Sequence, residues 1–73
     1  MAITKRIDRP IKNAMRARLE HILQHYREIA VSIDKFRVQT ANEEYVRFWD
    51  QLQHDNDELM RNISRYMVMR CNR

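Results

Sequence analysis

Apolar residues recur along this chain in two runs whose steps alternate between four and three residues. This spacing, about one apolar position every 3.5 residues, is typical of the buried side of a packed helix. The first run consists of Met15, Leu19, Ile22, Tyr26, Ile29, Ile33 and Phe36. The second, with one polar member, consists of Tyr45, Trp49, Leu52, Asn56, Leu59, Ile63 and Tyr66. We predict that these residues form the core of the protein or its interfaces.

The two runs do not share one phase. Continuing the spacing of the first run leads to Thr40, Arg47 and Arg61 instead of the apolar positions of the second run. The offset is two residues, which corresponds to about 200° of rotation on an unbroken α-helix. One long helix would therefore present its two apolar stripes on opposite sides, where no single partner could cover both. We predict instead that the chain reverses direction and forms an antiparallel helical hairpin.

Local signals place the ends of the two long helices. Asp8 suits the N-cap of the first helix, and Pro10 suits its first turn, where a missing N–H costs nothing. Residues 1–9 are expected to form a flexible basic arm. The remaining predicted segments are a helix over 10–38, a turn at 39–42, a helix over 43–70 and a tail at 71–73.

Two alternative caps are available for the second helix. Thr40 and Glu43 fit a capping box, in which the Thr40 side chain bonds to the N–H of residue 43 and Glu43 reaches back. Asn42 is the alternative cap, with Glu43 and Glu44 favourably placed in the first turn for the helix dipole. In the resulting hairpin, facing residue numbers add to 81 or 82, and every stripe residue then faces a stripe residue.

The composition favours an all-α protein that self-associates. The chain has no glycine and one proline, whereas sheet proteins need turn residues at several places. A hairpin of 73 residues buries little apolar surface, and its single cysteine, Cys71, excludes an internal disulfide. Each apolar stripe is also wider than a two-stranded seam. We predict a homodimer that forms a four-helix bundle, with antiparallel topology preferred and parallel topology as the alternative.

The second helix contains Leu52, Asp57, Glu58, Leu59 and Arg61. In these residues and in its outline, the predicted hairpin is similar to the small repressor-of-primer proteins, which regulate plasmid copy number as four-helix dimers. The resemblance implies a four-helix dimer, and it is one of shape, so no function is transferred.

Charge is distributed unevenly along the chain. Residues 1–18 carry +5 and residues 61–73 carry +4, whereas residues 20–58 carry −5. A hairpin brings both basic segments to one pole, and an arginine-rich pole suits forked contacts to phosphate. The predicted contacts to nucleic acid or another anion are made by Lys5, Arg6, Arg9, Lys12, Arg16, Arg61, Arg65 and Arg70.

The partner of this pole is predicted to be nucleic acid, with an acidic protein surface as the alternative. The sequence shows no helix-turn-helix, zinc finger or exposed aromatic platform, so backbone contacts are favoured over base reading. The predicted function is a small, non-enzymatic regulatory binding protein. The alternative is an adaptor or inhibitor that docks on a larger machine, such as a transcription or replication enzyme.

Polar residues near the stripes are candidates for a buried polar contact or for a metal site. Asn56 is either a buried residue that faces Tyr26, whose hydroxyl could bond to it, or a solvated one. His21 and His25 stand one helical turn apart and could bind a metal with Glu28. Solvated histidines are the favoured interpretation, so no metal and no cofactor are predicted.

The remaining features limit the class of protein. Phe36, Tyr45, Phe48 and Trp49 gather near the predicted turn, as a plug of the core or as a docking patch. The sequence shows no nucleophile–base pair or glycine-rich phosphate loop, so we expect no catalytic residues. A lone cysteine suits a reducing compartment, and no apolar run approaches the roughly 18 residues of a membrane span. We expect a cytoplasmic, nucleoid- or nucleus-associated protein without a membrane partner.

Overall fold

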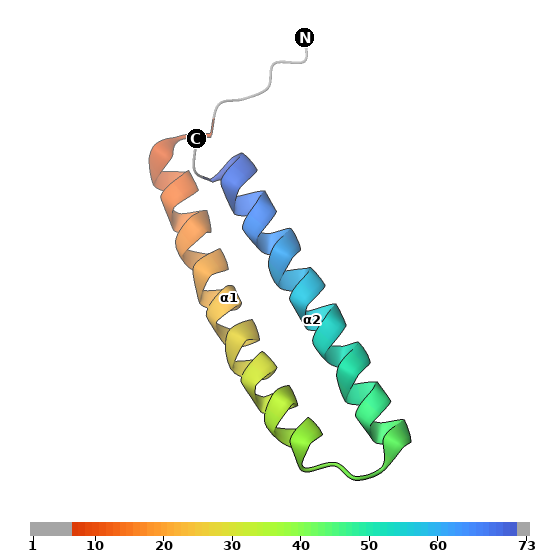
Figure 1. Ribbon diagram of the computed structural model, residues 1–73. Helices are drawn as coiled ribbons and strands as arrows, with labels where there is room; N and C mark the ends of the chain where they lie inside the picture. The colour runs from red at the N-terminus through yellow and green to blue at the C-terminus, as the bar shows by residue number, and fades with distance from the viewer. Residues whose placement is uncertain (1–6, 72–73) are drawn as a thin grey trace.

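The computed structural model describes residues 7–71 as two α-helices that lie side by side and antiparallel (Figure 1). Helix α1 is Arg9–Val38 and helix α2 is Glu43–Arg70. The start of α1 and the end of α2 lie at the same end of the molecule (Figure 1). The predicted all-α hairpin, with its reversal of direction between the two apolar runs, is confirmed.

Helix α1 begins one residue before the predicted start. Asp8 is its N-cap and has an extended backbone, and the Asp8 carbonyl accepts a hydrogen bond from the Lys12 N–H at 3.0 Å. Within the described residues, the Asp8 side chain makes no capping hydrogen bond. Pro10 occupies the first turn, where its fixed φ is already helical. Lys35 and Arg37 lie in the last turn, where cations stabilise the helix dipole.

The cap of α2 is Asn42, the second of the two predicted alternatives. The Asn42 Oδ1 atom accepts a hydrogen bond from the Tyr45 N–H at 3.2 Å. The capping box built on Thr40 is wrong, because the Thr40 hydroxyl donates to the carbonyl oxygen of Phe36 at 2.6 Å. Thr40 lies one residue after the C-cap Gln39, so its hydroxyl reaches back to the last turn of α1.

The seam between the helices is displaced from the centre of each predicted stripe. The innermost residues are Leu23, Ile33, Asn56 and Met67, which are 3–9% exposed. On α1 the seam follows Leu19, Leu23, Tyr26, Ala30 and Ile33, and on α2 it follows Trp49, Gln53, Asn56, Met60, Ile63 and Met67. Residues expected only to flank the stripes, such as Leu23 and Met60, therefore belong to the hairpin core.

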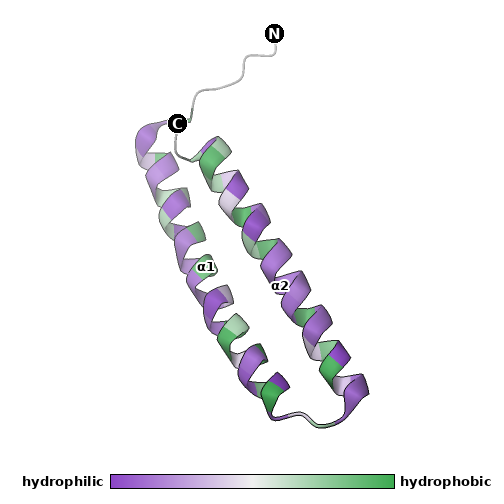
Figure 2. Cartoon of the chain, viewed as in Figure 1, coloured by the Kyte–Doolittle hydropathy of each residue, from purple (hydrophilic) through white to green (hydrophobic). Residues whose placement is uncertain are grey.

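Of the other predicted core residues, Leu52 is half-buried and seven are exposed in the single chain. Met15, Ile22, Ile29, Phe36, Tyr45, Leu59 and Tyr66 keep 39–63% of their surface accessible. The reason is geometric, because one neighbouring helix covers only one side of a broad apolar stripe. Hydrophobic segments (green) alternate with hydrophilic ones (purple) along both helices, in keeping with a surface that carries both apolar and polar side chains (Figure 2). In residues 7–71, neither helix is long and apolar enough to cross a membrane.

Candidate nucleic-acid interface

The hairpin brings basic residues of both chain ends to one pole. This pole, here called the open end, comprises residues 7–18 and 61–71 and carries seven bases against one acid, Asp8. Its bases are Arg9, Lys12, Arg16 and Arg18 from the start of α1 and Arg61, Arg65 and Arg70 from the end of α2. The described part of the pole therefore has a net charge of +6. Lys5 and Arg6, also predicted as contacts, lie outside the described residues.

One groove at the open end is largely apolar. It has a volume of about 460 Å³ and runs between the two helix ends, with Met15 and Tyr66 in its wall. Lys12, Arg18 and Arg70 border it. Three cations around an apolar groove suit a ligand with both a negative group and an apolar part.

A second groove, here called the basic groove, lies farther along the hairpin. Its residues are Leu23, Arg27, Asp57, Met60, Arg61, Ser64 and Arg65, and its volume is about 490 Å³. Leu23 and Met60 are the least exposed of these, whereas the three arginines are exposed. Guanidinium groups from both helices thus border one hollow, with a single carboxylate, Asp57, among them. This arrangement allows several forked contacts to neighbouring phosphates.

The predicted contact residues therefore divide between two surfaces. Lys12 and Arg70 border the apolar groove, and Arg61 and Arg65 border the basic groove. Arg65 also donates to the Oδ1 atom of Asn62, which directs its guanidinium along α2. Arg9 is exposed and Arg16 is half-buried at the same pole.

The sequence prediction missed two arginines of these grooves, Arg18 and Arg27. Arg27 lies in the acidic central segment, so a charge sum over residues 20–58 hides it. Only the alignment of the two helices shows that it stands beside Arg61 and Arg65. Helical wheels of the two helices, aligned at the hairpin register, would have shown Arg27 on the same side as Arg61 and Arg65.

Two amide side chains of α2 set the alignment of the helices. Asn56 Nδ2 donates to the carbonyl oxygen of Tyr26, and Gln53 Nε2 donates to that of Ala30, both at 3.0 Å. Asn56 is buried and lies opposite Tyr26, but its partner is the backbone and not the expected Tyr26 hydroxyl. The two acceptors are one helical turn apart, so both bonds form at one axial register. Sliding α2 along α1 would break both.

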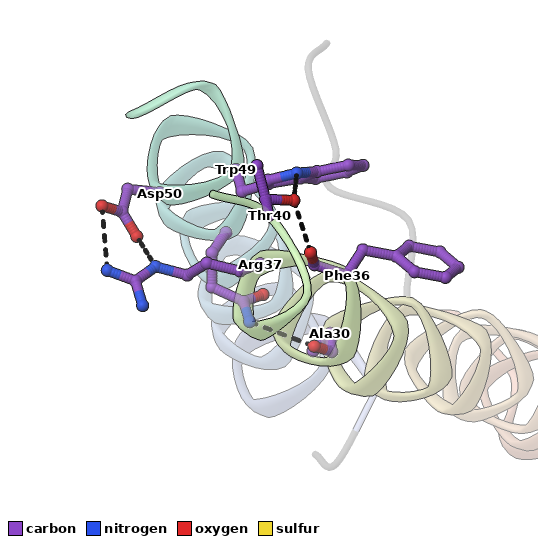
Figure 3. Close-up of polar contacts among 7 residues, drawn as sticks. Ala30, Phe36, Arg37, Thr40, Trp49 and Asp50 are labelled. Carbon is purple, nitrogen blue, oxygen red and sulfur yellow. Dashed lines mark hydrogen bonds and ion pairs between the residues drawn. The ribbon is translucent and has the colours of Figure 1, made fainter. Parts of the chain in front are cut away.

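The closed end of the hairpin is held by polar contacts around the turn (Figure 3). Arg37 and Asp50 form an ion pair in which Arg37 Nε bonds to Asp50 Oδ1, while Nη2 lies 3.4 Å from Oδ2. This hydrogen bond, together with the charge of Asp50, raises the pKa of Arg37. Arg37 is therefore paired with a carboxylate at the closed end and does not contribute to the charge of the open end.

Thr40 connects three parts of this end. Its Oγ1 atom accepts a hydrogen bond from Trp49 Nε1 at 3.0 Å and donates to the Phe36 carbonyl (Figure 3). The Trp49 ring also lies near two phenyl rings, with centroid distances of 5.9 Å to Phe36 and 6.1 Å to Phe48. Trp49 is half-buried, but Phe36, Phe48 and Tyr45 are 45–63% exposed. Of the four aromatic residues predicted there, only Trp49 therefore plugs the core.

Replacing Thr40 with valine should weaken the closed end. Thr40→Val keeps the side-chain shape but leaves the half-buried Trp49 N–H without its acceptor, which should cost about 1–2 kcal/mol in the free energy of unfolding. Denaturant titration followed by the fluorescence of Trp49, the only tryptophan, measures this change. Ser32→Ala, at an exposed position of α1, is the control and should have little effect. A Thr40→Val variant as stable as the control would show that the bridge does not hold the turn.

The histidines face solvent. His21 and His25 approach with 3.1 Å between their Nε2 atoms, and His25 Nδ1 lies 3.7 Å from Glu28 Oε1. Across residues 7–71, no group of three or more His, Cys, Asp or Glu residues is arranged to hold a metal ion. Cys71 is buried at the end of α2 as a free thiol.

Comparisons with protein-family models, curated proteins and solved structures found no significant match to this chain. Function is therefore inferred from the geometry and charge of the chain itself.

Proposed function

We propose that the protein is a small, non-enzymatic regulatory protein that forms a homodimer and binds nucleic acid phosphates through its arginine-rich open end. The observation that carries this proposal is the meeting of two basic chain segments at one pole, with a net charge of +6 over its described residues. Such a pole attracts the phosphate backbone irrespective of base sequence. The buried free thiol of Cys71 supports a reducing compartment, so we place the protein in the cytoplasm, nucleoid or nucleus.

The basic groove, which extends from Arg61 and Arg65 of this pole to Arg27, is the surface best suited to phosphate. Arg27, Arg61 and Arg65 border it from two helices. The hairpin register places the three side chains around one hollow, so several can contact neighbouring phosphates together. Sequence-independent contacts of this kind fit a protein that modulates access to nucleic acid, without reading bases.

The test is the salt dependence of binding to mixed duplex DNA, single-stranded DNA and RNA. Each phosphate contact contributes about 0.9 to the slope of log affinity against log salt for duplex DNA. Arg61→Gln combined with Arg65→Gln should therefore lower the slope by about 2 and weaken binding most at low salt. The matched control combines Lys35→Gln with Arg47→Gln, which removes the same charge from exposed positions near the closed end.

Three results would overturn the proposal. One is the absence of binding to all three probes at micromolar protein and low salt. The second is an equal loss of affinity in the control variant, which would show that binding depends only on the total charge of the protein. The third is an unchanged slope in the Arg61 and Arg65 variant, which would remove these residues from the interface.

Exposed aromatic residues at the closed end support a second candidate function. Tyr45 and Phe48 are 63% and 61% exposed, and the Phe48 ring lies 6.1 Å from the ring of the half-buried Trp49. Aromatic side chains are enriched at the centres of protein interfaces. An adaptor or inhibitor that docks on a transcription or replication enzyme would use this end. Phe48→Ala would then abolish partner capture without affecting nucleic acid binding.

A further inference from the structure

One side of the hairpin carries apolar residues that the rest of the described chain covers only in part. We call this side the apolar face. Its members recur every seven residues on both helices: Met15, Ile22, Ile29 and Phe36 on α1, and Tyr45, Leu52, Leu59 and Tyr66 on α2. At about 100° of rotation per residue, all eight project to the same side of the plane that contains both helix axes. The grooves agree, since Met15 and Tyr66 line one groove and Ile29 and Phe36 line another with Trp49.

We propose that the apolar face binds a second copy of this chain in antiparallel orientation, with α1 against α1 of the second copy and α2 against α2. The inference rests on the self-association in the proposed function and adds the face, the symmetry axis and the topology. A twofold axis that crosses both helices at right angles generates this arrangement.

The hairpin alone leaves its apolar side chains poorly covered. Among residues 7–71 only Leu23, Ile33, Asn56, Met67 and Cys71 are buried, and no side chain is less than 2% exposed. A domain of this size needs additional support for its core, commonly from association. Covering the apolar face would turn its seven-residue repeats into the inner positions of a four-helix bundle.

The apolar face is self-complementary about one axis. In an antiparallel pair of α1 helices, Met15 would meet Phe36 and Ile22 would meet Ile29, so the residue numbers in each pair add to 51. In the pair of α2 helices, Tyr45 would meet Tyr66 and Leu52 would meet Leu59, so the numbers add to 111. The two stripes are thus centred midway between residues 25 and 26 and midway between residues 55 and 56.

The internal register of the hairpin places these two centres at the same height. The hydrogen bond from Asn56 Nδ2 to the Tyr26 carbonyl, at 3.0 Å, joins residues within one position of both centres. One twofold axis therefore satisfies both helix pairs at once. Stripes centred at different heights would have left apolar residues unmatched at the ends.

Charge selects the antiparallel order, because a parallel dimer would match the same apolar stripes. Parallel packing would place two open ends together, each with a net charge of +6. Antiparallel packing places each open end beside residues 33–50 of the second copy, where four acids and three bases give −1. Like-charged ends within a Debye length of about 10 Å repel each other.

The same packing leaves the basic groove accessible. Arg27 and Arg61 border that groove on the side of the helix plane opposite the apolar face. Each copy would thus present its basic groove on the outer surface of the bundle. Dimerisation therefore leaves the basic groove free for phosphate, whereas Lys12, Arg18 and Arg70 border the groove at the edge of the apolar face.

Pulsed electron paramagnetic resonance measures the topology without nucleic acid, so its outcome is separate from that of phosphate binding. A nitroxide is attached to the full chain carrying Ala41→Cys and Cys71→Ser, which places one label beside the turn. In the proposed dimer, residue 41 lies level with residue 70 of the second copy, so 29 residues at 1.5 Å predict about 44 Å between labels. A distance below about 20 Å would indicate parallel packing, and the absence of any distance would indicate a monomer; either overturns the proposal.

A charge on the apolar face tests which side dimerises. Ile22→Asp should raise the dimer dissociation constant at least about 100-fold, since each copy would bury an unpaired carboxylate. The matched control, Val31→Asp, changes a residue that is 70% exposed on the opposite side and should leave the constant unchanged. Sedimentation equilibrium measures both. An Ile22→Asp variant that dimerises like the wild type would overturn the proposal, and the label distance decides the case should this variant fail to fold.

Discussion

Truncation of Ile33 to alanine is expected to remove most of the stability of this protein. Ile33 is only 3% exposed, the lowest value among the described hydrophobic residues of the core. Ile33→Ala should lower the free energy of unfolding by about 2–5 kcal/mol, because it removes buried methyl groups and leaves a cavity between the helices. Because the free energy of unfolding of small domains is itself only a few kcal/mol, we expect a large fraction of the Ile33→Ala variant to be unfolded at ambient temperature.

The matched control for this change lies two residues away on the same helix. Val31 is 70% exposed, and Val31→Ala should alter stability by no more than about 0.5 kcal/mol. Urea unfolding followed by circular dichroism compares both variants at one protein concentration, since self-association makes stability depend on concentration. Equal losses in the two variants would show that Ile33 does not lie in the seam.

Placing a carboxylate at position 56 is expected to make stability depend on pH. Asn56 is 7% exposed, and its amide donates to the Tyr26 carbonyl. In Asn56→Asp, an ionised carboxylate would face that carbonyl, acceptor against acceptor, in a buried site. We expect a loss of about 3 kcal/mol in the free energy of unfolding at pH 7.

The sign of this pH dependence follows from the proton affinity of the new side chain. Burial should raise the pKa of the carboxyl in the folded state above the value of about 3.9 in the unfolded chain. The folded state then binds more protons between these two values, so stability is retained below about pH 4 and falls as pH rises through the folded pKa. The protonated form also recovers a donor to Tyr26.

Asn62→Asp is the control for this pH series, because Asn62 is exposed on the same helix and its oxygen already accepts from Arg65. Chemical denaturation at pH 4 and at pH 7 gives the free energy of unfolding of each variant relative to the wild type. The change in that relative free energy between the two pH values is then compared for the two variants. A difference of the same size in both variants would place Asn56 at the surface of the folded protein.

The sequence by itself determined the two helices and the reversal between them. The four–three spacing of apolar residues specifies α-helix, and the two-residue slip after Phe36 excludes a continuous rod. Local chemistry placed a helix cap after this reversal but left Thr40 and Asn42 as alternatives, and the structure selects Asn42, whose Oδ1 atom accepts a hydrogen bond from the Tyr45 N–H. The sequence likewise showed the difference in charge between the basic ends of the chain and its acidic central segment, because this difference depends only on the order of residues along the chain.

Only the tertiary structure decided which half of each apolar stripe packs inside the hairpin. Both Leu23 and Ile22 are apolar neighbours on α1, yet one is 5% exposed and the other 42% exposed. A sequence period defines a stripe but not the rotation of each helix about its axis, which the contacts with its neighbour select. The same rotation brought Arg27 beside Arg61 and gave Asn56 a backbone acceptor. Such pairings join residues about 30 positions or more apart, where no local preference acts.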